Sequence, residues 1–464
     1  MVDHTKIVQG AATSSLGLLA EQAKQDNCVQ LILPYAQPML QTCVQCLNSY
    51  QERNMVLVCD TMAFVIECCK SRHDVVRSPQ FLQMMMPPLI ARWNSLKQAE
   101  DHQYVPIMEG MTSVAAAVGP GFEPFAPPVF SKCLDIIETA MIVVLGSEEA
   151  GEDCFDYIDV DPMCVALDLV AGIAEGLGNS FSTLLNASNF SDLLVHALKY
   201  HDLDVQQSSF GCLGEIGKAC PQFIVSHLPH IIPECMRAMS SATMSSALAG
   251  GYTAEGEDDE DDYVDADGDE VTNVCNNAIW CVGEIVLKVG PTPMQQFLGP
   301  ILNKLVGYVL SSSTDKVGVP IPESVRTNSA ITIGRLAMVA PQPVGGALGQ
   351  GLANFVKKWC LVIMEMPDDE EKVDACLGVT LVAKAYPQAL VADAKTLGFL
   401  AHAFLSWDPD IANGLNNGLI EQFRALFQGF ANSMGQQGWH QLKMSWGGGA
   451  AAGLRDKLMA AFGV

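Results

Sequence analysis

Acidic side chains recur at matching places in a series of otherwise apolar segments. They stand three or four, ten or eleven, or thirteen residues after the valine that opens each segment, and they are Glu21, Asp60, Glu67, Glu109, Asp168, Glu175, Glu215 and Glu284. Carboxylates gathered on one surface produce a negative field that attracts basic segments. The pattern therefore predicts an acidic binding groove, with ordinary solvated helix faces as the alternative reading.

One aromatic residue stands beside these acids. Trp280 precedes Glu284 by four residues, which places both on one side of a helix. A tryptophan next to acids can stack on an arginine or hold an apolar side chain of a ligand. A tryptophan buried in the core is the alternative.

The elements that carry these residues are predicted to be helices. Between Cys164 and Gly176, for example, Val165, Leu169 and Ile173 recur every fourth residue and form one apolar face. Eight such segments open at Val8, Val56, Val105, Val165, Val205, Val274, Val325 and Val373. Most of these starts are roughly 40–50 residues apart, near the period of HEAT repeats. We expect an all-α fold, a HEAT-repeat superhelical solenoid of antiparallel helix pairs.

Small residues and helix breakers support this organisation. The segments are rich in Ala, Gly, Ser, Cys and Thr, which let a neighbouring helix approach closely, as a stacked solenoid requires. Several close on Gly119, Gly178, Gly290, Pro341 or Pro387, which are helix stop signals. A second set of helices is expected at Pro-Leu clusters such as Met86-Pro87-Pro88-Leu89, with the prolines near the helix starts.

Acidic stretches divide the expected array. We predict HEAT repeats over 1–246 with an acidic loop at 147–161, a disordered acidic insertion at 247–272, and further HEAT repeats over 273–464. Residues Glu255 to Glu270 are dominated by acids, and such a block repels itself and cannot bury a core.

Composition narrows the class of protein. The 464-residue chain has a formal net charge of −26, so direct binding of a nucleic-acid backbone is not expected. No apolar run long enough to span a bilayer is evident, so no membrane contact is expected. The 16 cysteines stand within apolar periodic stretches, as small core residues do in a reducing compartment, which favours the cytoplasm or nucleus.

Catalytic and metal motifs give little support to an enzyme. There is no P-loop, and Cys43-Val-Gln-Cys46 has no partner pair at zinc spacing. Around Asp265 a calcium-type loop lacks its final glutamate. We therefore expect no catalytic residues, no metal and no cofactor.

Several blocks in the same order resemble the C-terminal half of transportin, the karyopherin-β2 branch of the importin-β superfamily. The blocks are Met84–Asn94, Ala166–Gly178, Gln207–Gly214, Asn276–Ile285, Asn328–Leu336, Asp369–Lys372 and Lys457–Val464. The resemblance implies a nuclear import receptor that shuttles between cytoplasm and nucleus and binds nuclear localisation signals on an acidic inner surface. Those signals are disordered and basic, end in Arg and Pro-Tyr, and belong typically to RNA-binding proteins.

Carried over by position, the resemblance assigns a set of cargo-binding residues. They are Glu21, Asp60, Glu67, Glu109, Asp168, Glu175, Glu215, Asn276, Trp280 and Ile331. Trp280 and Ile331 would receive an apolar or basic epitope, and the carboxylates would pair with Lys and Arg. We call the seven acids of this set, from Glu21 to Glu215, the acidic ladder.

The resemblance also sets limits. The family's N-terminal half, which binds the Ran GTPase, has no counterpart here, so we expect a fragment or partial receptor that meets Ran only through that half. Nucleoporins are a further expected partner. At two cargo-site positions the chain departs from the family, with Cys164 for a larger aliphatic residue and Phe64 for a small polar one. The alternative function is a HEAT scaffold that organises other proteins without recognising a signal.

Overall fold

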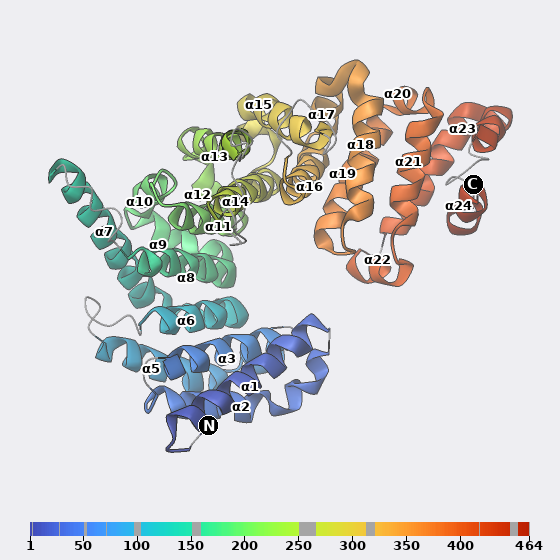
Figure 1. Cartoon of the computed structure of the whole chain (residues 1–464). Coiled ribbons are helices and arrows are strands. Elements are labelled where there is room, and N and C mark those ends of the chain that lie inside the picture. Colours follow the sequence, from blue (N-terminus) through green and yellow to red (C-terminus); the bar gives the residue numbers. More distant parts are fainter. Residues whose placement is uncertain are drawn as a thin grey trace, which may run out of the picture. The chain divides into compact units, whose positions relative to one another are not determined.

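A computed structural model describes the chain except for residues 2, 27, 51–52, 71, 97–103, 151–158, 250–265, 312–320, 417, 446–452 and 464. Every regular element in the described part is a helix (Figure 1). The predicted all-α repeat fold is confirmed.

Each of the eight predicted segments forms a helix, but the helix predicted to open at Val274 begins well before it, at Ala266. These helices are α1 (Lys6–Gln25), α3 (Arg53–Cys69), α6 (Tyr104–Val118), α8 (Asp161–Leu177), α11 (Leu203–Ala219), α14 (Ala266–Val289), α16 (Glu323–Val339) and α19 (Glu370–Ala385). Their periodic apolar residues are buried. In α8, for example, Leu169 and Ile173 are both fully buried.

The remaining helices complete the pairs. The longer ones are α2 (Leu33–Leu47), α5 (Pro79–Ser95), α7 (Ala126–Ala150), α10 (Phe190–Ala197), α13 (Leu228–Ala249), α15 (Pro291–Leu310), α17 (Pro341–Leu348), α18 (Leu352–Glu365), α21 (Ala394–Leu405), α23 (Leu419–Ser445) and α24 (Leu454–Phe462). The shorter α-helices are α4 (His73–Val76), α9 (Ser182–Asn186), α12 (Pro221–Val225), α20 (Pro387–Val391) and α22 (Pro409–Leu415). The 3-10 turns are η1 (Val29–Leu31), η2 (Gly119–Phe122), η4 (Gly178–Phe181) and η5 (Gly349–Gly351).

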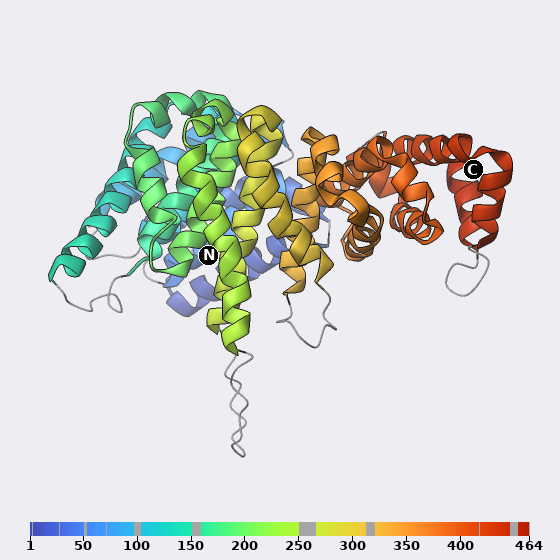
Figure 2. The same ribbon diagram turned by 90° about the horizontal axis from the view of Figure 1, so that it is seen from above.

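The chain divides into two compact units, Met1–His227 and Leu228–Val464. In unit 1, α1, α3, α6, α8 and α11 pack side by side in one row, and α2, α5, α7 and α10 cover one side of it. In unit 2, α14, α16, α19 and α23 form one row, and α13, α15, α18, α21 and α24 form the other. Figure 2 shows the helices within each unit from above. Each unit is a two-layer stack of helix pairs.

Small residues let the helices of a row approach closely. A Cβ added at Gly176 of α8 would lie 2.2 Å from the carbonyl oxygen of Ala115 in α6. Hydroxyl groups bridge neighbouring helices as well: Thr61 donates to the carbonyl oxygen of Thr13, and Thr332 to that of Ile279, each over 3.1 Å. The close approach expected from the small residues is therefore present in both units.

The predicted stop signals act as expected. Gly119, Gly178 and Gly290 all adopt positive φ directly after a long helix, and Pro341 and Pro387 each begin the next helix. The placement of the Pro87-Pro88 pair was wrong. The pair lies inside α5, which begins at Pro79. The buried side chains of Met86 and Leu89 hold this helix together despite the backbone donors that proline removes.

The acidic stretches are described only at their edges. Residues 147–150 belong to α7 and residues 266–272 to α14, so helix extends farther into both stretches than predicted. Acids such as Asp269 near the start of α14 are favoured there because they complement the positive end of the helix dipole. The predictions for 151–158 and 250–265 fall outside the described residues.

One stretch, Asp161–Asn186, is long and apolar enough by composition to cross a membrane. In its most apolar window 67% of the residues are buried inside the protein. The stretch comprises α8, η4 and α9, and α8 packs between α6 and α11. Its apolar residues therefore form the core of unit 1.

Candidate functional site: an acidic row in unit 1 and Trp280 in unit 2

The acidic ladder lies along a single row of helices in unit 1. Glu21 is on α1, Asp60 and Glu67 on α3, Glu109 on α6, Asp168 and Glu175 on α8, and Glu215 on α11. Because these helices are neighbours in space, acids from distant parts of the sequence occupy adjacent positions. None of the seven belongs to the buried core.

Asp60, Glu109 and Asp168, which we call the central carboxylates, come from three consecutive helices of the row. Asp60 is half-buried, and Glu109 and Asp168 are solvent-exposed. None of the three forms an ion pair with any residue that the structure describes. They present unneutralised negative charge to the solvent.

The pKa values of the central carboxylates are raised by their surroundings. Although Asp168 reaches solvent, neighbouring protein atoms crowd its carboxyl group and reduce its hydration, which raises its pKa to about 6. A hydrogen bond with Ser208 opposes this shift more weakly. The same desolvation raises the pKa of Asp60. The pKa of Glu109 is raised by desolvation and then by repulsion from Asp60, Asp168 and Asp161. Glu109 is therefore close enough to Asp60 and to Asp168 to be repelled by both, and a cation beside it would relieve that repulsion.

Three other ladder acids already have a basic partner. Lys24 of α1 pairs with Glu67 of α3, and Lys70, which follows α3, pairs with Glu175 of α8 over 2.5 Å. Within α11, Lys218 pairs with Glu215 over 3.1 Å. We call Glu67, Glu175 and Glu215 the paired glutamates. The seventh acid, Glu21, accepts a hydrogen bond from Gln25 over 3.3 Å.

The predicted residues of unit 2 have mixed surroundings. Asn276 and Trp280 lie one turn apart on α14, and both side chains are partly exposed. The Nδ2 group of Asn276 donates to Ser324 Oγ over 3.0 Å, while its Oδ1 atom is buried without a partner. Trp280 is only partly buried, unlike Trp93 and Trp359, which are buried in their cores.

Two predicted residues of unit 2 are more buried than expected, and the ligand contact of Ile331 stays a prediction. Ile331 is only 2% exposed because α16 packs between α14 and α19, so it is a core residue in this structure and not an open contact. Glu284, which the spacing pattern placed among the exposed acids, is 8% exposed and accepts from Arg335 Nη2 over 3.1 Å. The close packing of unit 2 thus removes both side chains from the surface.

Arg335 is a charged centre that the pattern of acids did not reveal. Its side chain is 5% exposed and contacts Glu284, Glu371 and Asp374 from the two flanking helices. Space for it exists because Gly283 has no side chain: a Cβ there would lie 2.9 Å from Arg335 Cδ. The one sequence signal was an arginine within the small and apolar residues of Asn328–Leu336. We assign this cluster to the stability of unit 2.

Possible metal ligands and the Cys43/Cys46 pair can both be placed in the described part of the chain. No group of three or more His, Cys, Asp or Glu side chains there could hold a metal ion. Cys43 and Cys46 are buried, as predicted for core cysteines. Burial raises the pKa of the Cys43 thiol to about 12, so it is protonated and unreactive at neutral pH.

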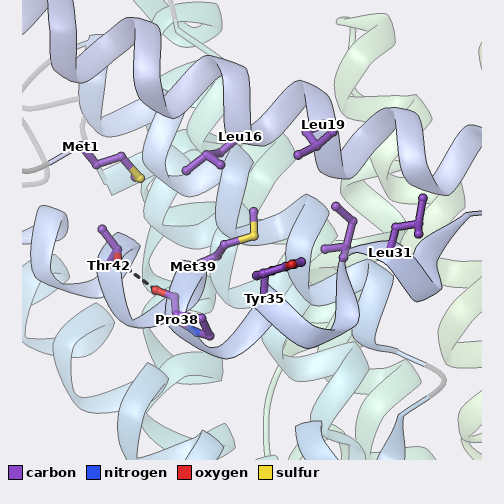
Figure 3. Close-up of a pocket in the computed structure, with 9 residues that line it drawn as sticks. Met1, Leu16, Leu19, Leu31, Tyr35, Pro38, Met39 and Thr42 are labelled. Atoms are coloured by element: carbon purple, nitrogen blue, oxygen red, sulfur yellow. Dashed lines mark hydrogen bonds between the residues drawn. The ribbon is translucent and has the colours of Figure 1, made fainter.

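An apolar pocket of about 530 Å³ opens between α1 and α2 (Figure 3). Leu16, Leu19, Tyr35 and Met39 point into it, and none of its lining residues is Asp, Glu, Lys, Arg or His. Its lining contains no acid of the ladder, so the pocket is distinct from the acidic ladder.

The fold belongs to the class of all-helical repeat solenoids. No family model matches the chain. The Kap95:Nup1 complex contains a chain with TM-score 0.53 and 13% identity, and the match covers 99% of this chain and 50% of that one. An importin beta crystal structure gives TM-score 0.50 and 13% identity, with coverage of 100% and 54%. At this level of identity the two structures support the fold alone.

Sequence comparison points to transportin. Human transportin-1 (Homo sapiens) is 30% identical over 465 residues, which cover 100% of this chain and 45% of that protein. Transportin-1 of Oryza sativa subsp. japonica is 27% identical, with coverage of 95% and 43%. Importin subunit beta-2 of Schizosaccharomyces pombe is 26% identical, with coverage of 84% and 38%. The predicted resemblance to transportin is confirmed, and the chain spans less than half the length of these relatives.

Proposed function

We propose that this chain is the C-terminal, cargo-binding half of a transportin-like nuclear import receptor. In this proposal the acidic ladder binds the basic residues of a disordered nuclear localisation signal that ends in Arg and Pro-Tyr. Its cargo proteins are RNA-binding proteins, and the receptor moves between cytoplasm and nucleus. Similarity to transportin-1 along the whole chain supports the proposal.

The observation that carries it is the row of central carboxylates. Three acids from consecutive helices, the middle one repelled by the other two, have no cationic partner in the described part of the chain. They can accept lysine or arginine side chains from an extended peptide. An arginine forms two parallel hydrogen bonds with a carboxylate, which adds geometry to charge. A disordered ligand loses entropy when it binds, so several such contacts must act together.

Trp280 is proposed to provide a second kind of contact. Its partly exposed ring on α14 can receive an apolar side chain or stack against an arginine. Asn276, one turn away, is partly exposed and donates its amide to Ser324 Oγ over 3.0 Å, which fixes its side chain beside this contact. Ile331 would join this contact only if α16 moved relative to α14.

Partners of the longer relatives are proposals for this chain. Kap95, which shares the fold, is seen in complex with Nup1, and nucleoporins are a partner class to test. Ran is proposed to bind the part of the longer relatives that lies outside the region matched by this chain. No catalytic role is proposed.

A fluorescence anisotropy titration tests the function. The probe is a labelled disordered peptide with a basic centre and an Arg…Pro-Tyr end, and glutamine replaces its basic residues in a control peptide. We expect the Asp60→Asn, Glu109→Gln, Asp168→Asn triple variant to bind at least about tenfold more weakly, or about 1.4 kcal/mol. The matched control is the Glu123→Gln, Asp135→Asn, Asp192→Asn variant, which removes equal charge outside the ladder.

Trp280→Ala distinguishes a signal receptor from a scaffold. A receptor should lose about tenfold in affinity with this change. Equal binding of the basic and glutamine peptides, or equal loss in ladder and control variants, would contradict the proposal. Those results would leave the HEAT scaffold as the better interpretation.

A further inference from the structure

Two lysines reach across helix boundaries to acids of the ladder. Lys24 of α1 pairs with Glu67 of α3, and Lys70 pairs with Glu175 of α8. The partners lie 43 and 105 residues apart in the sequence, so the stacking of the helices brings them together. Each pair places a primary ammonium group on a ladder carboxylate, which is the contact that a ligand lysine would make.

These pairs are exposed. The side chains of Lys24 and Glu67 are 54% and 39% exposed, and those of Lys70 and Glu175 are 49% and 38% exposed. Exposed ion pairs contribute little to stability and are further weakened by salt. A ligand cation can therefore replace either lysine without disturbing the buried core.

The ladder thus has two kinds of carboxylate. The central carboxylates have no cationic partner in the described part of the chain, while Glu67 and Glu175 are neutralised by the protein itself. We propose that Lys24 and Lys70 are internal counterions that occupy two ligand positions in the free protein and are displaced when a basic segment binds. This inference rests on the proposed function, since it concerns the same acidic surface.

The arrangement has a consequence for specificity. Within the described residues, a single cation finds ladder carboxylates without an ion pair at the three central positions and at Glu21. A ligand with several spaced cations can in addition displace the two lysines, so the pairs disfavour short basic segments more than long ones. Lys24 and Lys70 would then influence the affinity for a ligand without binding the ligand themselves.

The test is a comparison of lysine variants in the full chain with the labelled basic peptide. We expect the Lys24→Met, Lys70→Met variant to bind about fivefold tighter at low salt. The gain should largely disappear at high salt, where exposed charges are screened. Lys6→Met and Lys395→Met are the controls, since both lysines are exposed and form no ion pair within the described residues.

A double-mutant cycle adds a second readout. In the wild type, Glu67→Gln with Glu175→Gln should weaken peptide binding, because it removes two acids and leaves Lys24 and Lys70 as unpaired cations. In the lysine double variant the same substitutions should remove the gain. A thermal melt of each variant verifies that the fold is retained.

The outcomes separate this inference from the proposed function. If the lysine variant binds no tighter than the control variants while the central-carboxylate variant still loses affinity, only the counterion inference is overturned. If neither wild type nor lysine variant binds the basic peptide, both are overturned. A gain confined to the Lys24→Met, Lys70→Met variant would support the displacement of internal lysines.

Discussion

Arg335 Nε donates a 2.9 Å hydrogen bond to Asp374 Oδ2 and thereby ties α16 to α19 in unit 2. The same guanidinium contacts Glu284 of α14 over 3.1 Å, so one side chain holds three consecutive helices. It also neutralises part of the negative charge that the close packing has buried. In unit 1 the central carboxylates have no such arginine within the described residues. Glu284 of unit 2 is therefore neutralised by an arginine, whereas the central carboxylates of unit 1 are not neutralised by any described residue.

Removal of Arg335 should strongly destabilise unit 2. Arg335→Met keeps a long apolar stem but leaves Glu284 buried and unpaired. Loss of one partner of a buried pair costs about 3–5 kcal/mol, and urea unfolding would measure it. The control Arg237→Met breaks a more exposed pair with Glu234 and should change stability by less than about 1 kcal/mol. Equal effects of the two substitutions would contradict the role assigned to Arg335.

The contact between Gly378 and Gly334 should not tolerate a larger residue. A Cβ at Gly378 would lie 2.4 Å from Gly334 Cα, so Gly378→Ala must push α19 away from α16. We expect a loss of about 1–3 kcal/mol in unfolding free energy. Gly307→Ala is the matched control, because nothing lies within 4 Å of its added Cβ. That change should stabilise α15 by about 0.5–1 kcal/mol, since alanine favours helix more than glycine.

Binding of a basic ligand should weaken as the pH falls from 7.5 to 5.5. Desolvation raises the pKa of Asp168 to about 6, and the pKa values of Glu109 and Asp60 are also raised, so all three carboxylates lose charge in or below this range. We expect an affinity loss of several-fold for a peptide whose cations are arginines, which stay charged. Anisotropy titrations across the pH range would measure it. The Asp168→Asn variant should show a weaker pH dependence, and an unchanged profile would exclude Asp168 as its source.

Ionisation of Asp168 should destabilise the folded protein, whereas ionisation of an acid in a salt bridge stabilises it. The pKa of Asp168 is higher in the folded protein than its usual value of 3.8, so the folded state binds more protons between pH 4 and 6. Its contribution to the free energy of unfolding should therefore decrease as the pH rises through that window. At pH 7.5 Asp168→Asn should raise the melting temperature of unit 1, and at pH 4 the difference should vanish. A melting temperature lowered at pH 7.5 would contradict the desolvation of this carboxylate.

Local patterns in the sequence were sufficient to place the helices. The spacing of apolar residues located all eight helices that open at the recurring valines, and glycines with positive φ ended three of them. Such features act over a few residues and can be recognised without the fold. The Pro87-Pro88 pair was misplaced because tertiary burial of its neighbours outweighed the local preference of proline.

For the candidate site, the sequence determined the positions of the acids, and the packing determined which of them stay charged and accessible. The sequence alone determined that acids recur in phase with the repeats, which places them on one row once the helices stack. It did not determine which acids stay charged and accessible. Glu284 is buried by Arg335 of the next helix, Glu175 is paired with Lys70 from 105 residues away, and Asp168 has no cation within the described residues. Electrostatic neutralisation depends on distances in space between residues far apart in sequence, and only the packing of the helices sets those distances.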